Sequence, residues 1–109
     1  NLHIYQAANP SIYLEDDNNA VRIQGGADLR FFTSATERMT ILESGNVGVG
    51  VYAANEKLTV EGVTSLREQA TSPALTANYG KVYAKTDAKL YYKASNGTNC
   101  YFKTFYTRC

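Results

Sequence analysis

The chain has 109 residues, which is room for one domain or for several very small modules in a row. Its 11 Lys and Arg residues nearly balance its 10 Asp and Glu residues, and with the two signs interspersed this argues against nucleic acid as a main partner. No apolar run approaches the roughly 18 residues of a membrane-spanning helix, which argues against membrane insertion, and no signal-peptide pattern opens the sequence.

The composition predicts a thin hydrophobic core. Leu, Ile, Val and Phe together make up roughly a fifth of the chain, close to the lowest share from which a globular core forms. Tyr, Thr, Asn, Ser and Gly are plentiful, and this mixture favours strands and tight turns over helices. A lone domain of this size and composition is only marginally stable. Surface buried against other copies of the chain would supply the missing stability, so the composition is a first indication of an obligate oligomer.

The first half of the chain predicts short strands separated by turn residues at spacings of about 8 to 12 residues. Several of the apolar runs alternate with polar residues, as half-buried strands do. The expected strands are residues 12–14, 21–24, 29–32, 38–42, 47–51 and 57–60.

The segment 47–51 alternates valine with glycine. A period of two places Val47, Val49 and Val51 on one side of a strand. The glycines between them leave the other side bare, so that another backbone can approach closely there. Such a strand is weak in a single sandwich, and it suits the crowded axis of a threefold assembly.

Residues 62–70 are the one stretch with helical character, where Thr64 or Ser65 is a candidate N-cap. The same stretch equally fits an extended connector, and Pro73 ends it because the residue before a proline avoids the helical region. The chain is thus expected to divide into a strand-repeat region at 1–62, a connector with or without a short helix at 63–76, and a C-terminal module at 77–109.

The C-terminal module predicts an antiparallel meander with strands at 80–84, 89–93 and 98–105. Asn96-Gly97 is the strongest hairpin signal in the chain, because a type I′ turn needs positive φ at both central residues. The aromatic residues of the module are expected to pair across strands. Exposed rings also stack on sugars, which makes Tyr91, Tyr101 and Tyr106 candidate ligand-facing aromatics.

The two cysteines, Cys100 and Cys109, lie close together near the end of the sequence. A bridge between them would close a short loop, a bridge between chains is equally open, and two free thiols are a third reading. No Cys/His cluster has metal-ligand spacing, and His3 is the single histidine, so that neither a zinc site nor a Ser-His-acid triad is expected. We therefore predict no cofactor and no enzyme activity.

Residues 37–50, ERMTILESGNVGVG, followed by residues 57–62, KLTVEG, resemble a repeat of bacteriophage tail-fibre and related virion appendage proteins. Residues 12–16 and 26–31 are similar to the strands that precede this repeat. The resemblance covers residues 10–62, a little over half of the chain. The C-terminal segment, through ANYGKVY and LYYK, is more weakly similar to a short terminal module of phage structural proteins.

In many such proteins the repeat is followed by an intramolecular chaperone domain of the endosialidase type, which cleaves itself off with a Ser and Lys pair. The opening motif of that domain is missing here, and only 47 residues follow Gly62. Self-cleavage is therefore not expected of this sequence. Since the chain does not begin with Met, it is processed, truncated or part of something longer, and a removed chaperone domain remains open.

The resemblance implies an all-β, extended and intertwined homotrimeric fibre or spike, displayed on the virion surface, outside cells. Its partners would be further copies of itself and other virion structural proteins, and it would contribute to host attachment. The residues expected to pack between subunits are Val47, Val49, Val51, Leu58 and Val60.

Two other functions fit the residues. One is a small extracellular β module that binds a host surface glycan through its tyrosines. The other is a cell-surface filament subunit, which open head-to-tail contacts would distinguish from a closed trimer.

Overall fold

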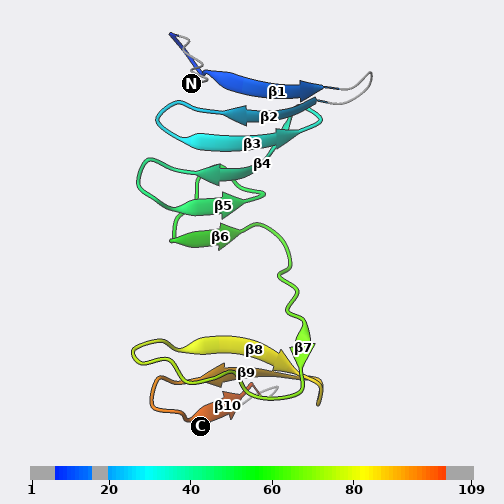
Figure 1. Ribbon diagram of the computed structural model, residues 1–109, viewed down its shortest axis with the longest axis vertical. Coiled ribbons are helices and arrows are strands. Elements are labelled where there is room, and N and C mark those ends of the chain that lie inside the picture. Colours follow the sequence, from blue (N-terminus) through cyan, green and yellow to red (C-terminus); the bar gives the residue numbers. More distant parts are fainter. Residues whose placement is uncertain (1–6, 16–19, 103–109) are drawn as a thin grey trace. The chain divides into compact units, whose positions relative to one another are not determined.

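The computed structural model describes residues 7–15 and 20–102 of the chain (Figure 1). All of the regular structure within these residues is β, as the sequence predicts. The chain forms two compact units, Asn1–Thr64 and Ser65–Cys109, and each is described by itself below.

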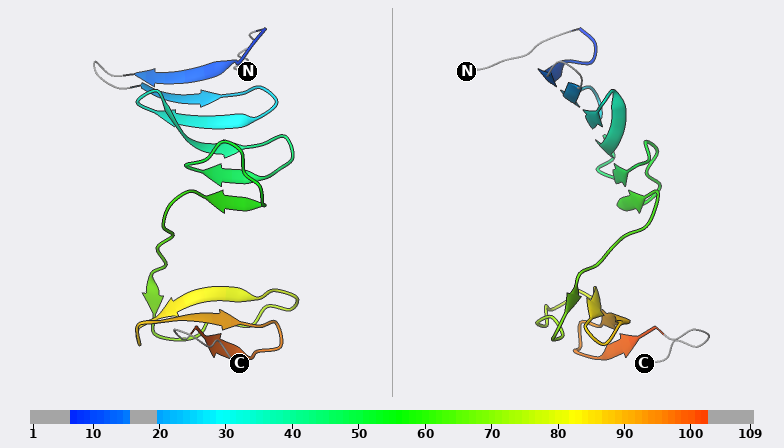
Figure 2. Two further views of the ribbon diagram at one scale, coloured as in Figure 1. Left: turned by 180° about the vertical axis from the view of Figure 1, so that it is seen from behind. Right: turned by 90° about the vertical axis from the view of Figure 1, so that its right-hand side faces the viewer.

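The first unit is a six-stranded sheet in which the strands lie side by side in sequence order (Figure 2). Neighbouring strands pair antiparallel except the last two, which are parallel. The strands are β1 (Ser11–Glu15), β2 (Ala20–Gln24), β3 (Leu29–Thr33), β4 (Thr36–Ile41), β5 (Val47–Val49) and β6 (Leu58–Val60).

The turns of this sheet follow local backbone chemistry. Ser34 and Ala35 form the two-residue connection between β3 and β4, with φ of 48° and 59°. Positive φ at both positions is the geometry of a type I′ hairpin, here without the usual Asn-Gly pair. Gly45, with a φ of 86°, closes the turn after β4, where its amide donates to the Leu42 carbonyl at 2.8 Å.

The expectation that Val51 shares a face with Val47 and Val49 is wrong. Gly50 has a φ of 74°, in the left-handed region, so the chain turns there and the alternation ends. A Cβ on Gly48 would overlap the carbonyl oxygen of Val51 and touch its side chain. Val51 therefore lies on the bare side of the strand, and the backbone that approaches the glycine belongs to the same chain.

The second unit is a four-stranded sheet in the order β10-β9-β8-β7. Its strands are β7 (Glu68–Gln69), β8 (Lys81–Lys85), β9 (Lys89–Lys93) and β10 (Asn99–Tyr101). The three strands of the predicted meander pair antiparallel, while β7 adds to β8 in parallel.

Residues 62–70 contain no helix, so the helical reading of this stretch is wrong. Glu68 and Gln69 instead pair with Ala84 and Lys85. A helix this short is marginal alone because its nucleation is unfavourable, whereas an existing strand edge offers hydrogen-bond partners at once.

The predicted hairpin after β9 forms, but with a different turn from the type I′ turn expected. The amide of Gly97 donates to the Ala94 carbonyl at 3.0 Å, and only Gly97 has positive φ, at 94°. This is the three-residue loop that ends in a left-handed residue. The loop after β8 repeats it, with the Ala88 amide donating to Lys85 at 3.0 Å and a φ of 62° at Ala88.

Replacing Ala88 by glycine is expected to stabilise the second unit. The left-handed conformation is unfavourable for an L side chain, and its relief outweighs the extra freedom of glycine in the unfolded chain. We expect Ala88→Gly to raise the free energy of unfolding by about 0.5 to 1 kcal/mol, and Gly97→Ala to lower it by a similar amount. Urea denaturation at one fixed protein concentration measures both, and a destabilising Ala88→Gly would contradict the assigned turn.

Candidate functional site

One face of the first sheet is lined with apolar side chains from all six strands. The strand register places them together, because paired residues and every second residue along a strand share a face. We call this set the apolar face: Ile12, Leu14, Val21, Ile23, Leu29, Phe31, Met39, Ile41, Val47, Val49, Leu58 and Val60.

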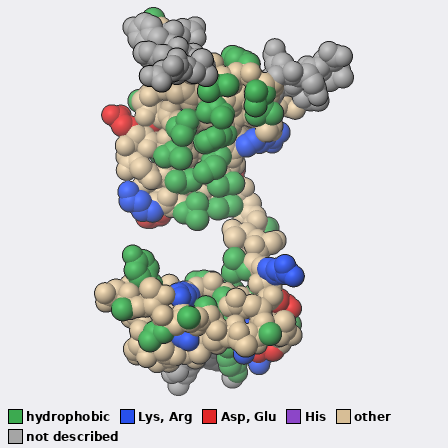
Figure 3. Space-filling view, in the orientation of Figure 1, with side chains coloured by type: hydrophobic (Ala, Val, Ile, Leu, Met, Phe, Trp, Pro, Cys, Tyr) green, Lys and Arg blue, Asp and Glu red, His purple; other side chains and the backbone are tan. Residues whose placement is uncertain are grey.

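The apolar face is open to solvent within the chain. Leu14 and Leu58 are each 64% exposed, and Val49, which ends β5 and pairs with Met39 and Val60, is 39% exposed. Hydrophobic side chains form a continuous band across this sheet in Figure 3. Monomeric proteins rarely expose so large a contiguous apolar surface, and such surfaces mark interaction sites.

The opposite face of the same sheet is covered by the chain itself over β2 to β5, whereas Tyr13 of β1 is 55% exposed. The guanidinium of Arg22 lies 3.8 Å from the ring centroid of Phe32, which is buried, and also donates to the Tyr13 hydroxyl at 3.2 Å. The loop after β5 returns over this face and buries Ala54. Thr40, fully buried there, donates to the carboxylate of Glu37. We call this the covered face, and among the described residues it is the apolar face that has no other segment packed on it.

Asp28 connects the covered face to two loops. Its carboxylate accepts hydrogen bonds from the Glu43 amide at 2.9 Å and from the Tyr52 hydroxyl at 3.1 Å, and Arg30 lies 3.4 Å away. The backbone hydrogen bond from Glu43 lowers the pKa of Asp28 below its ordinary value, helped by Tyr52 and Arg30.

Acid is therefore expected to weaken the first unit through Asp28. A carboxyl whose pKa is depressed by folding contributes stability above its unfolded value, near 3.8, and loses that contribution as pH falls through the folded pKa. Asp28→Asn should be less stable at neutral pH, and its stability should fall less than that of the wild type below pH 3.8. Thermal unfolding as a function of pH tests this, and parallel curves for the two proteins would contradict it.

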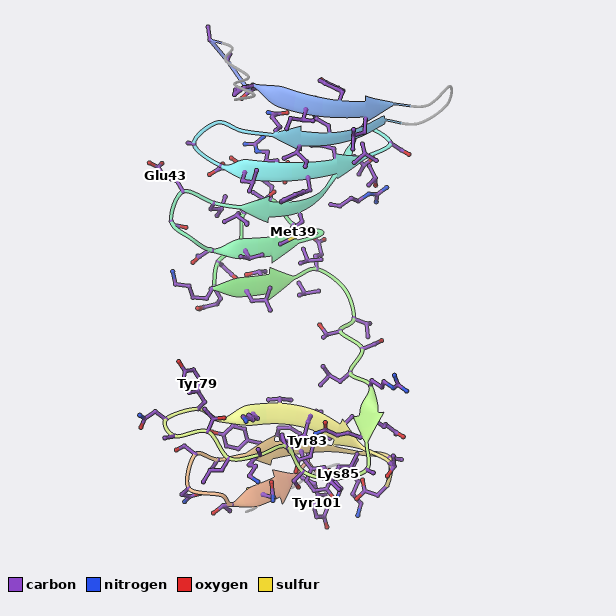
Figure 4. The ribbon with its side chains drawn as sticks, viewed as in Figure 1. Met39, Glu43, Tyr79, Tyr83, Lys85 and Tyr101 are labelled. Atoms are coloured by element: carbon purple, nitrogen blue, oxygen red, sulfur yellow. The ribbon has the colours of Figure 1, made fainter. Side chains whose placement is uncertain are left out.

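The second sheet carries tyrosine and lysine on one face. The register aligns Tyr83, Tyr91 and Tyr101 across three strands, and it pairs Lys81 with Lys93 and Lys85 with Lys89. Figure 4 shows Tyr83, Lys85 and Tyr101 gathered on this sheet. We call this set the tyrosine–lysine face.

One half of the tyrosine–lysine face forms the small core of the unit. Tyr83 is 6% exposed, and its hydroxyl lies 2.9 Å from the Ser72 hydroxyl and 3.0 Å from Oδ1 of Asn99. The ammonium of Lys93 donates to the Pro73 carbonyl at 3.0 Å, and Lys81 donates to the next carbonyl, that of Ala74. Two of the four lysines thus attach residues 73 and 74 to the sheet.

The other half lies beside the hairpin loop. The rings of Tyr83 and Tyr91 stack with centroids 5.3 Å apart, and the Tyr91 hydroxyl donates to Asp87 at 2.6 Å. This bond lowers the pKa of Asp87 and raises that of Tyr91 to about 12. The ammonium of Lys85 lies 5.1 Å from the Tyr91 centroid, and that of Lys89 lies 4.6 Å from the Tyr101 centroid.

The reverse face of the second sheet is also apolar and exposed. The register places Val82, Leu90, Tyr92 and Phe102 on the side away from the lysines or at its margin, and each is between 39% and 56% exposed. Both units therefore present an apolar sheet face to solvent.

The predicted site residues distribute as follows. Val47, Val49, Leu58 and Val60 come together on the apolar face, and Val51 does not. Tyr91 and Tyr101 line the tyrosine–lysine face, with their rings against lysines and one another. Cys100 is disulfide-bonded and buried. His3, Tyr106 and Cys109 lie outside the described residues.

The lysines are the feature that sequence reasoning missed. The whole-chain charge of +1 conceals two opposite halves, because residues 1–64 carry four Lys and Arg against eight Asp and Glu, while residues 65–109 carry seven against two. A count by region would have found a positive C-terminal module. The spacing of four between successive lysines, from Lys81 to Lys93, is the second signal.

Across residues 7–15 and 20–102 no group of three or more His, Cys, Asp or Glu residues is arranged to hold a metal ion. The same residues include no helix with the length and apolarity to span a membrane. Comparison of the chain with known proteins finds no protein-family model that matches it and no matching sequence among curated proteins.

Proposed function

We propose that this chain is a structural subunit of a bacteriophage virion appendage, a fibre or capsid-mounted spike built as a homotrimer. The observation that carries the proposal is the apolar face, which runs unbroken over all six strands of the first unit while the opposite side of the sheet is covered over β2 to β5. The subunit would project from the particle, bind other virion structural proteins at its base and contribute to host attachment.

The energetics favour further copies of the chain as the partner. Burial of one large aliphatic side chain is worth about 1.5 to 3 kcal/mol, so the apolar face offers far more than the few kcal/mol by which a small domain is stable. Copies related by rotational symmetry present the apolar face of each chain to a shared axis, and this face is then buried in every copy. The number three comes from the resemblance of residues 37–62 to the tail-fibre repeat.

The second unit supports the same reading, since its own apolar face, with Val82 56% and Phe102 48% exposed, also calls for a partner. A subunit assembled through both units would be stabilised in each of them by contacts between chains. The proposed role is structural and includes no enzyme activity.

Electron microscopy of the purified chain in negative stain tests the proposal. We expect discrete particles whose end views average with threefold symmetry. Open filaments of unlimited length would instead identify a cell-surface filament subunit, because head-to-tail contacts do not close. Single chains would contradict assembly altogether and leave the small glycan-binding module as the better function.

A further inference from the structure

The hairpin of β8 and β9 places like charges directly opposite each other. Lys85 pairs with Lys89 next to the loop, and Lys81 pairs with Lys93 at the far end of the same two strands. Like charges at opposed positions of an antiparallel pair are destabilising. At the far end the cost is offset, because the two ammonium groups donate to backbone carbonyls of residues 73 and 74.

At the loop end the two ammonium groups lie on aromatic rings instead. Lys85 is placed over Tyr91 and Lys89 over Tyr101. Such contacts are favourable and hold each lysine in position, but a ring neutralises no charge. Tyr91, under Lys85, also stacks on Tyr83 and bonds to Asp87, and Tyr101, under Lys89, has its ring centroid 5.8 Å from that of Tyr91.

The nearby carboxylates offset only part of this charge. Asp87 accepts hydrogen bonds from the Tyr91 hydroxyl at 2.6 Å and from the Lys89 amide at 3.2 Å, and its charge also interacts with Lys89 and Lys85. One carboxylate offsets at most one of the two ammonium charges. Glu68 pairs in register with Ala84, which places it on the reverse face of the sheet. The loop end of the tyrosine–lysine face therefore carries two positioned ammonium groups beside one carboxylate, a net positive charge within a unit that is itself positive.

We propose that Lys85 and Lys89 form a binding site for an anionic polysaccharide, whose carboxylate or sulfate groups meet the two ammonium groups. The inference deepens the proposed function, on which it rests, by naming the chemistry that the appendage would recognise on a host surface. Lys85 and Lys89 lie over the Tyr91 and Tyr101 rings, on which a neutral sugar would otherwise stack. The ligand is therefore recognised by its negative charge. Because the lysine side chains cover these rings, nucleic-acid bases cannot stack on them either. Several copies in one assembly would raise the affinity for a repeating polymer.

Binding of the full chain to immobilised polymers tests the site. The probes are polygalacturonate for carboxylate, dextran sulfate for sulfate, unmodified dextran as the neutral polymer, and single-stranded DNA. We expect binding to at least one of the two acidic polysaccharides, weakened by added salt, and no binding to dextran. The responses to polygalacturonate and dextran sulfate decide which anionic group is recognised. Binding that is equal on dextran, or stronger on DNA than on both acidic polysaccharides, would overturn the proposal.

The variant Lys85→Gln/Lys89→Gln is expected to bind the acidic polymer roughly tenfold more weakly or worse, because two charge-assisted contacts are lost in every copy. The matched control Lys57→Gln/Arg67→Gln removes the same formal charge elsewhere and should bind within about twofold of the wild type. Lys85→Arg/Lys89→Arg keeps the charge and the ring contacts and should retain binding. Equal loss in the control and in the glutamine variant would show only a general charge effect and would refute the site.

Sedimentation of the glutamine variant separates this inference from the function on which it rests. Both lysines lie on the side of the second sheet away from its apolar face, so the variant should assemble like the wild type. Assembly without polysaccharide binding in the wild type would reject the binding site alone, and absence of assembly in the wild type would reject the proposed function.

Discussion

Val49→Asp is expected to prevent assembly of the chain. Val49 lies on the apolar face and pairs with Met39 on one side and Val60 on the other. In an assembled particle the new carboxylate would be buried without a partner, which costs several kcal/mol in every subunit. In a separate chain the position is 39% exposed, so the sheet itself tolerates the charge. Size-exclusion chromatography with light scattering should report single chains or smaller species.

Val63→Asp is the matched control for this experiment. It makes the same chemical change at a residue that is 93% exposed and lies outside both sheets. The control should assemble like the wild type. If Val49→Asp also assembles with wild-type mass, the apolar face does not lie between subunits.

Gly48→Ala is expected to destabilise the first unit by about 3 kcal/mol, a large effect for one methyl group. The added Cβ would overlap the backbone carbonyl of Val51, and a backbone group cannot move aside as a flexible side chain can. Relief requires the loop after β5 to shift, which would also disturb the contact of Tyr52 with Arg30, whose hydrogen bond is 2.9 Å long. Chemical denaturation followed by circular dichroism measures the loss.

Gly26→Ala provides the comparison at a glycine with room for a methyl group. The nearest atom that its Cβ would meet is the Asn9 side-chain oxygen at 3.5 Å, an ordinary contact. We expect this variant to lie within about 0.5 kcal/mol of the wild type. Similar stabilities for the two alanine variants would mean that Val51 does not pack over Gly48.

The strands and the apolar face follow closely from alternation in the sequence. A period of two placed Val47 and Val49 together, and Leu58 and Val60 join them because β6 pairs with β5 in register. The alternation misled at Val51, since a pattern of side chains does not show that Gly50 adopts positive φ and reverses the chain. The helix signal at 62–70 failed for a related reason: a strand edge far along the chain competed for its backbone.

The contacts of the tyrosine–lysine face could not be predicted from the periodicity of the sequence alone. The sequence indicated Tyr91 and Tyr101 as ligand-facing rings, but it could not show that lysines from the paired strand lie over them. That arrangement depends on the register of β8 with β9, which the three-residue loop ending at Ala88 sets. One residue more or less in the loop would put Lys85 and Lys89 on opposite faces.

Sedimentation equilibrium of the wild-type chain at micromolar concentration tests most directly whether copies of this protein cover one another's exposed sheet faces. The account predicts a single closed species with the mass of three chains, stable on dilution. A monomer at the same concentration, soluble and folded, would contradict it, because the twelve side chains of the apolar face would then need no partner from another chain.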